Sequence, residues 1–92
     1  MSTTIFITVL VNPPVLRIEL KDCLGALIGR SEVKKGEEIV VAIDRLLKAS
    51  KLNSTNVMDV LVECETGASM LSCQMAMAAR DTFLFTKTIN NS

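Results

Sequence analysis

The period of the hydrophobic pattern changes from two to that of a helix after Val33, which places a group of strands before the first helix. Residues 4–11 form an apolar, β-branched run, which predicts a strand covered on both faces. In residues 15–20 apolar side chains alternate with charged ones, as in a half-buried strand. A third strand is expected over residues 23–33, and the short turns between these strands make all three antiparallel.

Beyond this point helices and strands are expected to alternate. Residues 36–50 have apolar side chains at helical spacing, and a second helix is expected over about 68–80. Strands are predicted over 57–62 and 83–89. The predicted order is β-β-β-α-β-α-β, an α/β fold with a mixed five-stranded sheet whose last two strands are parallel to the first. This order is similar to that of a single ribonuclease-H-like unit, which is also one half of the actin-like ATPase fold.

The composition bounds the size of the domain and its partners. A chain of 92 residues makes one domain, 1–92, and its ten basic and ten acidic residues leave no net charge. We therefore expect no direct contact with nucleic acid or an anionic membrane. The apolar fraction of 49% is high for so small an interior, so part of this surface is expected to face a partner. The apolar run 5–11 is too short to span a membrane and no secretory signal is recognised, which predicts a cytoplasmic location.

Few residues offer catalytic or metal-binding chemistry. The chain has no histidine, the commonest general base and metal ligand. Its three cysteines, Cys23, Cys64 and Cys73, are odd in number and form no C-x-x-C pair, which indicates neither a disulfide framework nor a zinc site. Cys64 and Cys73 are the candidates for a reactive pair, although free cysteines behave mostly as small apolar residues. No metal and no cofactor are expected.

Three segments carry a resemblance to a known family. They are the helical run Ile43-Asp44-Arg45-Leu46-Leu47, the strand Met58-Asp59-Val60-Leu61-Val62, and the turn Glu65-Thr66-Gly67-Ala68-Ser69. Over residues 15–80 this pattern resembles the TsaB (YeaZ) family, bacterial partner proteins of tRNA threonylcarbamoyladenosine synthesis. The resemblance implies a partner, a TsaD-type ATPase, met through a helix bundle formed with the first two helices.

The departures from the family argue against an enzyme. Leu10 occupies the position at which the ATPase relatives have an acidic residue, and residues 1–12 contain no acid to hold Mg²⁺. The turn before the second helix keeps only Gly67 of a glycine-rich phosphate loop, and Glu65 adds a negative charge there. A small nucleotide-binding enzyme is therefore disfavoured, and the chain is expected to be a truncated, non-catalytic relative.

The helices are the predicted interaction surface. Fourteen uncharged residues separate Glu65 from Arg80, and they include several methionines and a stripe of small side chains. The candidate interface residues are Ile39, Val40, Ile43 and Leu47 on the first helix, and Met70, Cys73, Ala76 and Met77 on the second. The occupant is a TsaD-like ATPase or, alternatively, a second copy in a self-associating structural or regulatory domain. Both helices packing wholly on one sheet face is the competing interpretation.

Overall fold

The computed structural model describes residues 2–12 and 16–91 of the chain. Four strands and two helices follow each other in the order β-β-β-α-β-α, with a 3₁₀ turn before α1 and another before β4. The elements are β1 (Thr3–Val9), β2 (Leu16–Asp22), β3 (Leu27–Val33), α1 (Ile39–Ala49), β4 (Val57–Cys64) and α2 (Met70–Asn91). Val15, the predicted first residue of the second strand, lies outside the described residues.

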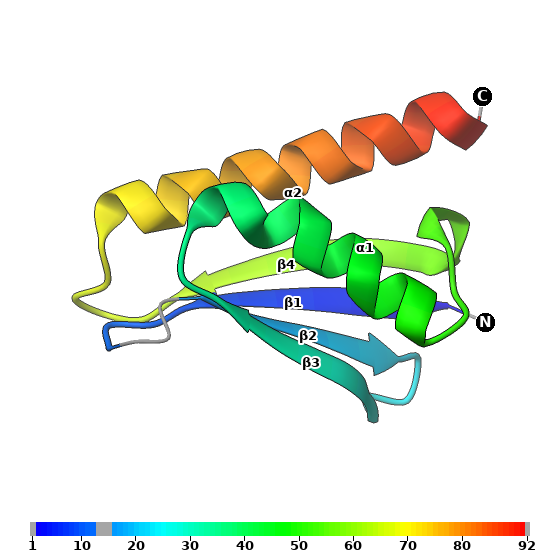
Figure 1. Cartoon of the computed structure of the whole chain (residues 1–92), viewed down its shortest axis with the longest axis horizontal. Helices are drawn as coiled ribbons and strands as arrows, with labels where there is room; N and C mark the ends of the chain where they lie inside the picture. The colour runs from blue at the N-terminus through cyan, green and yellow to red at the C-terminus, as the bar shows by residue number, and fades with distance from the viewer. Residues whose placement is uncertain (1, 13–15, 92) are drawn as a thin grey trace.

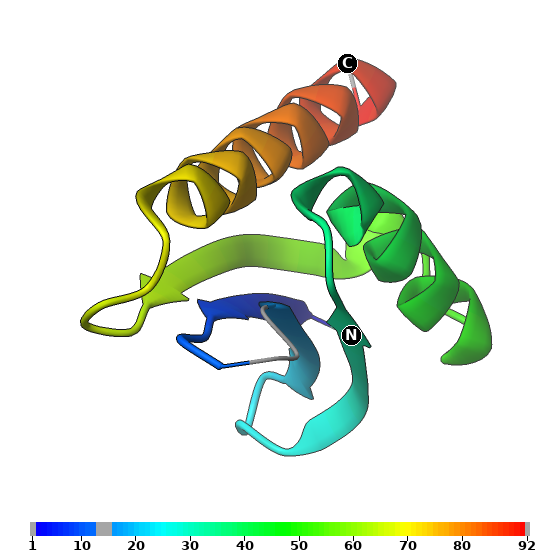
Figure 2. The same cartoon turned by 60° about the vertical axis from the view of Figure 1, so that its left-hand side comes forward.

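The strands form one mixed sheet in the order β3-β2-β1-β4. β2 is antiparallel to β1 and to β3, whereas β4 is parallel to β1. The α/β class, the three antiparallel strands and the parallel return strand are thereby confirmed. Both helices lie on the same face of the sheet, α2 over β4 and β1 and α1 over β2 and β3 (Figures 1 and 2).

The core lies between this face and the helices. Along β1 and β2 every second side chain is buried, because successive side chains of a strand point to opposite faces. The buried apolar side chains are Ile5, Ile7, Val9, Leu16, Ile18, Leu20, Val33, Ile39, Ala42, Ile43, Leu47, Val57, Val60, Ala76 and Ala79. Thr4, Phe6 and Thr8 alternate with the buried side chains of β1, so they point to the helix-free face, where they are half-buried. The prediction that the first strand is covered on both faces is therefore wrong.

The predicted fifth strand over residues 83–89 is also wrong, because these residues continue α2, which is one helix of 22 residues. Residues 70–91 contain neither glycine nor proline, so nothing in the sequence stops the helix once it has begun. Phe83 follows Ala76 and Ala79 at helical spacing and packs against the core. The β-propensity of this segment depends on neighbouring strands and is overridden by that packing.

The 3₁₀ turn before α1 approaches α2 at Gly36. A Cβ added at this glycine would lie 2.6 Å from the Met75 Cβ, which is closer than real carbon atoms approach. We expect Gly36→Ala to lower the free energy of unfolding by about 1–3 kcal/mol, measured by urea denaturation, because the helices must move apart. Gly29→Ala is the matched control: its Cβ would meet the flexible end of Leu46 at 3.2 Å and the Ser50 hydroxyl oxygen at 3.9 Å. A Gly36→Ala protein as stable as the parent would contradict the close approach.

Candidate interaction surface

The eight residues predicted to form an interface divide into two groups. Ile39, Ile43, Leu47 and Ala76 are at most 4% exposed and pack in the core between the helices and the sheet. They hold α1 and α2 in place and present almost no surface to a partner. Here the competing interpretation, in which the helices pack on the sheet, describes their position.

The other predicted interface residues reach the surface to different extents. Val40 is 40% exposed, Met77 44% and Met70 75%, whereas Cys73 is half-buried at the inner side of α2. The part of the predicted interface that is accessible in this chain therefore lies mainly on α2.

The outer face of α2 carries several large apolar side chains next to the exposed Gln74 and Asp81, whereas the exposed face of a helix is usually polar. We define the α2 outer surface as Met70, Leu71, Met77 and Phe85, of which Leu71 is 65% and Phe85 67% exposed. Sequence reasoning missed Phe85, because it assigned that residue to a strand. It also missed Leu71, which is not part of the small-residue stripe, although the uncharged run between Glu65 and Arg80 contains it.

The outer face of α1 is different. Asp44 and Lys48, one helical turn apart, form an exposed ion pair with 2.9 Å between Lys48 Nζ and Asp44 Oδ2. Apolar side chains face the core and charged ones face outward, apart from the partly exposed Val40 and Val41. An amphipathic helix of this kind buries its apolar side chains against its own sheet. By contrast, α2 has apolar side chains on both its inner and its outer face.

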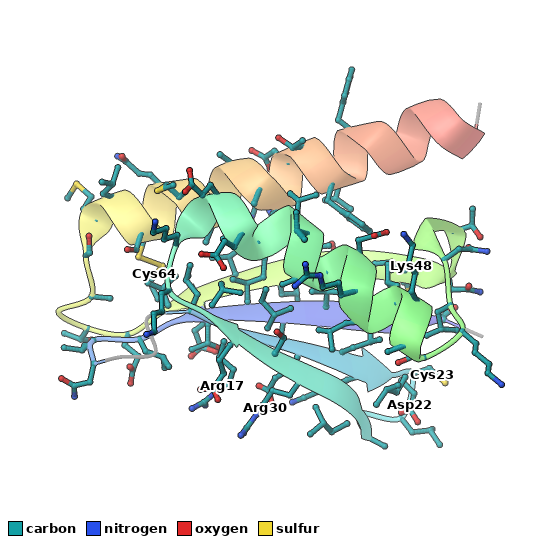
Figure 3. All side chains as sticks on the ribbon, in the orientation of Figure 1. Arg17, Asp22, Cys23, Arg30, Lys48 and Cys64 are labelled. Carbon is teal, nitrogen blue, oxygen red and sulfur yellow. A yellow bond between two sulfur atoms is a disulfide. The ribbon has the colours of Figure 1, made fainter. Side chains whose placement is uncertain are left out.

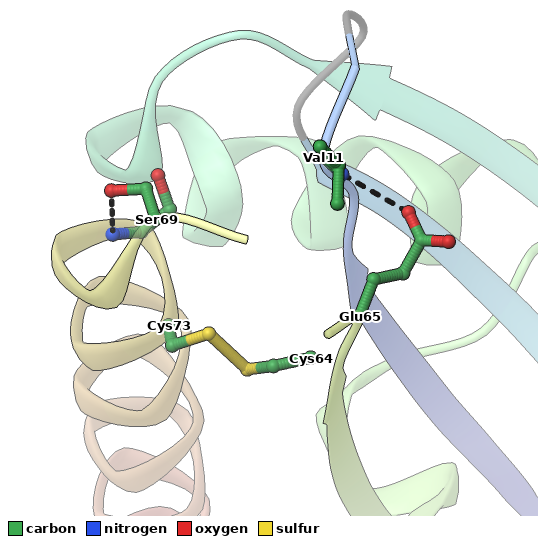
Figure 4. The surroundings of a disulfide bond; sticks show 6 residues. Val11, Cys64, Glu65, Ser69 and Cys73 are labelled. Atoms are coloured by element: carbon green, nitrogen blue, oxygen red, sulfur yellow. Dashed lines mark hydrogen bonds between the residues drawn. A yellow bond between two sulfur atoms is a disulfide. The ribbon is translucent and has the colours of Figure 1, made fainter. Parts of the chain in front are cut away.

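The carboxyl ends of β1 and β4 meet at the edge where α/β proteins commonly bind ligands. Here the Glu65 side chain accepts a hydrogen bond from the Val11 amide at 3.0 Å (Figure 4). The Glu65 amide donates a hydrogen bond to the Val9 carbonyl at 2.9 Å. The Ser69 hydroxyl oxygen accepts a hydrogen bond from the Ser72 amide at 3.4 Å. At this edge the Glu65 carboxylate and the Ser69 hydroxyl therefore accept hydrogen bonds from backbone amides of the same chain. Among residues 2–12 and 16–91, no group of three His, Cys, Asp or Glu side chains could hold a metal.

Cys64 and Cys73 form a disulfide, which corrects the prediction from cysteine spacing (Figure 4). Their Cα atoms are 6.1 Å apart across a separation of nine residues. Cys64 ends β4 on the helix-covered side, and Cys73 lies on the inward side of α2, so the turn between them brings the two side chains together. Cys23, in the turn between β2 and β3, is an exposed free thiol.

On the helix-free face of the sheet, β2 and β3 carry charged side chains. Arg17 lies opposite Glu32 and Arg30 opposite Glu19 in adjacent strands, and both arginines point away from the helices (Figure 3). Lys21 Nζ lies 4.8 Å from the centre of the Phe6 ring. Charges of both signs alternate here, as on a solvated sheet face.

A shallow groove of about 300 Å³ lies between the end of β3 and α1. Three carboxylates, one guanidinium and small or aliphatic side chains line it: Ser31, Glu32, Val33, Glu37, Glu38, Val41, Ala42 and Arg45. No further observation points to a ligand for this groove.

Comparison with known proteins gives no match to a family model, to a curated protein or to a solved structure. Within the described part of the chain, neither helix is long and apolar enough to cross a membrane.

Proposed function

We propose that this chain is a non-catalytic protein-interaction module that docks through the α2 outer surface. The observation that carries the proposal is the exposure of Met70, Leu71, Met77 and Phe85 on one helix. Covering a large apolar side chain contributes up to about 1.5–3 kcal/mol, so water is an unfavourable environment for this surface. Methionine side chains also adapt their shape to a partner more readily than branched ones.

The arrangement at the carboxyl ends of β1 and β4 supports a role without catalysis. The residue just beyond the end of β1 is the apolar Leu10. The Glu65 carboxylate near this edge accepts a hydrogen bond from the Val11 amide, so this acid already has a structural function. A catalytic acid or a metal ligand needs its oxygen atoms directed toward a substrate or ion instead.

The strand order supports the ribonuclease-H-like relationship as part of the same proposal. In the sheet β3-β2-β1-β4, three antiparallel strands are followed by a helix and a strand parallel to the first, as in the early part of such a unit. The TsaB-like role, with a TsaD-type ATPase as the partner, is the specific form that we propose. Self-association of the same surface is the alternative.

Charge placed on the α2 outer surface tests the proposal. The chain is examined by sedimentation alone and mixed with a purified TsaD-type ATPase. If the chain associates with itself or with the ATPase, Met77→Glu and Phe85→Glu should each weaken that association about 30-fold, because a carboxylate buried in the interface loses its hydration.

Leu24→Glu is the matched control, since Leu24 is an exposed apolar residue in the turn between β2 and β3. It should leave the association unchanged. Absence of association in both samples at 100 µM, or equal weakening by all three variants, would contradict docking through α2 with these partners.

A further inference from the structure

The outer edge of β4 is an unpaired sheet edge within the described residues, because β4 is the last strand in the order β3-β2-β1-β4. The Glu65 amide, just after β4, donates to the Val9 carbonyl of β1. Successive residues of a strand direct their amide and carbonyl groups to opposite sides. Val60, Val62 and Cys64 therefore direct their amide and carbonyl groups away from β1, toward the free edge.

The beginning of this edge is protected and its end is open. The Val60 amide donates to Asp59 Oδ1 at 2.8 Å, and the register against β1 shifts next to Met58. Bulges and local caps of this kind discourage pairing. Neither the bulge nor the Asp59 carboxylate covers the backbone amide and carbonyl groups of Val62 and Cys64. Residues 57–64 also contain no proline or lysine, the residues that usually protect an edge strand.

The exposed side chains of β4 carry negative charge. Asp59 and Glu63 flank Leu61 on the helix-free face, and residues 57–65 include no basic side chain. The ion pairs of the described residues lie on α1 and α2, so these two carboxylates have no cationic partner there. Opposite charges across a strand pair stabilise it and like charges destabilise it.

These charges disfavour pairing with a second copy and favour a basic partner. Two antiparallel β4 strands centred on Leu61 would place Asp59 opposite Glu63 of the second copy, so acid would face acid. A strand with lysine or arginine at alternate positions would instead face both acids.

The other side of an added strand would meet apolar surface beside Val62 and α2. Met75 faces Gly36 in the 3₁₀ turn before α1. Side chains two residues apart lie on nearly opposite sides of a helix, so Met77 is on the flank of α2 away from α1, toward the outer edge of β4. Met77 is 44% exposed and is thus available to apolar side chains of such a strand.

We propose that the free edge of β4 binds an extended segment of a partner protein in which basic residues alternate with apolar ones. This inference rests on the proposed function and adds a strand-pairing site to it: backbone hydrogen bonds supply affinity, and the alternation supplies specificity.

The test uses a synthetic heptapeptide of alternating lysine and valine, with a glutamate–valine peptide for comparison. The fluorescently labelled basic peptide should bind saturably, and the acidic peptide at least tenfold more weakly. Exchange of the Val62 and Cys64 amide protons, followed by NMR, should slow at least tenfold. Glu63→Lys should weaken the basic peptide roughly three- to tenfold, whereas Glu32→Lys, an exposed acid on the opposite edge strand, should not.

Three results would overturn the proposal: no saturable binding of the basic peptide, binding without protection of the Val62 and Cys64 amides, or equal binding of the acidic peptide. If these two amides become protected without peptide as the protein concentration rises, a second copy of the chain occupies the edge, and this result would also overturn the proposal. Phe85→Glu, away from the sheet edge, separates this inference from the proposed function. If this variant loses ATPase docking but still binds the peptide, the edge site of β4 is independent of docking through α2. If the peptide does not bind while ATPase docking persists, the edge site fails and docking through α2 stands.

Discussion

The Ala76→Glu variant is expected to lose about 3–5 kcal/mol of folding free energy, a large fraction of the 5–15 kcal/mol typical of a domain. Ala76 is fully buried on the inner face of α2. A glutamate there must either bury an unpaired carboxylate or lift the helix from the sheet, and both cost several kcal/mol. Urea denaturation followed by circular dichroism measures the loss.

Ala78→Glu is the control for this change, because Ala78 is an exposed alanine on the same helix, two residues away. It introduces the same charge and a similar helix propensity, so its effect should stay within about 0.5–1 kcal/mol. If both variants unfold at the same urea concentration, α2 does not pack on the sheet through Ala76. If Ala76→Glu is instead a folded monomer that fails to associate, Ala76 belongs to the interface and not to the core.

Breaking the disulfide is expected to lower stability by about 2–3 kcal/mol. The bond between Cys64 and Cys73 closes a short loop from the end of β4 to α2, and a loop of this size restricts the unfolded chain by about that amount. Cys73→Ala should show the full loss in urea, and dithiothreitol should cause the same loss in the parent protein.

Two controls separate the disulfide from other effects of thiol chemistry. Cys23→Ala removes the exposed free thiol and should leave the stability unchanged. Dithiothreitol should have no further effect on Cys73→Ala. Titration of three free thiols in the unfolded, unreduced parent protein would show that the bond does not form, and its predicted contribution would then be absent.

The disulfide also bears on the predicted cytoplasmic location. A reducing cytoplasm keeps most cysteine pairs as thiols, so in that compartment α2 would depend on packing alone. Thiol trapping in intact cells before lysis measures which form is present.

Local patterns were sufficient for much of the sheet and for α1. The alternation in residues 15–20 and the β-branched run 4–11 predicted β2 and β1, and the helical spacing from residue 36 predicted α1. These elements have a single buried stripe, so the period of the apolar residues determines both the element and its inward face. Residues 70–91 contain no helix breaker, which favours a long helix, whereas the β-branched and aromatic residues at 83–89 favour a strand.

Only the tertiary structure decided the end of the fold and the division of α2 into core and surface. Residues 83–89 could be helix or strand by propensity, and packing of Phe83 beside Ala79 and Ala76 selects the helix. The run from Met70 to Met77 is uncharged and mostly apolar on all sides of the helix, so its period could not separate Ala76 in the core from Met77 at the surface. Likewise, the pairing of Cys64 with Cys73 follows from the meeting of a strand end with a helix, and not from their spacing along the chain. Sequence patterns report periodicity within an element, whereas contacts between elements depend on how the elements pack.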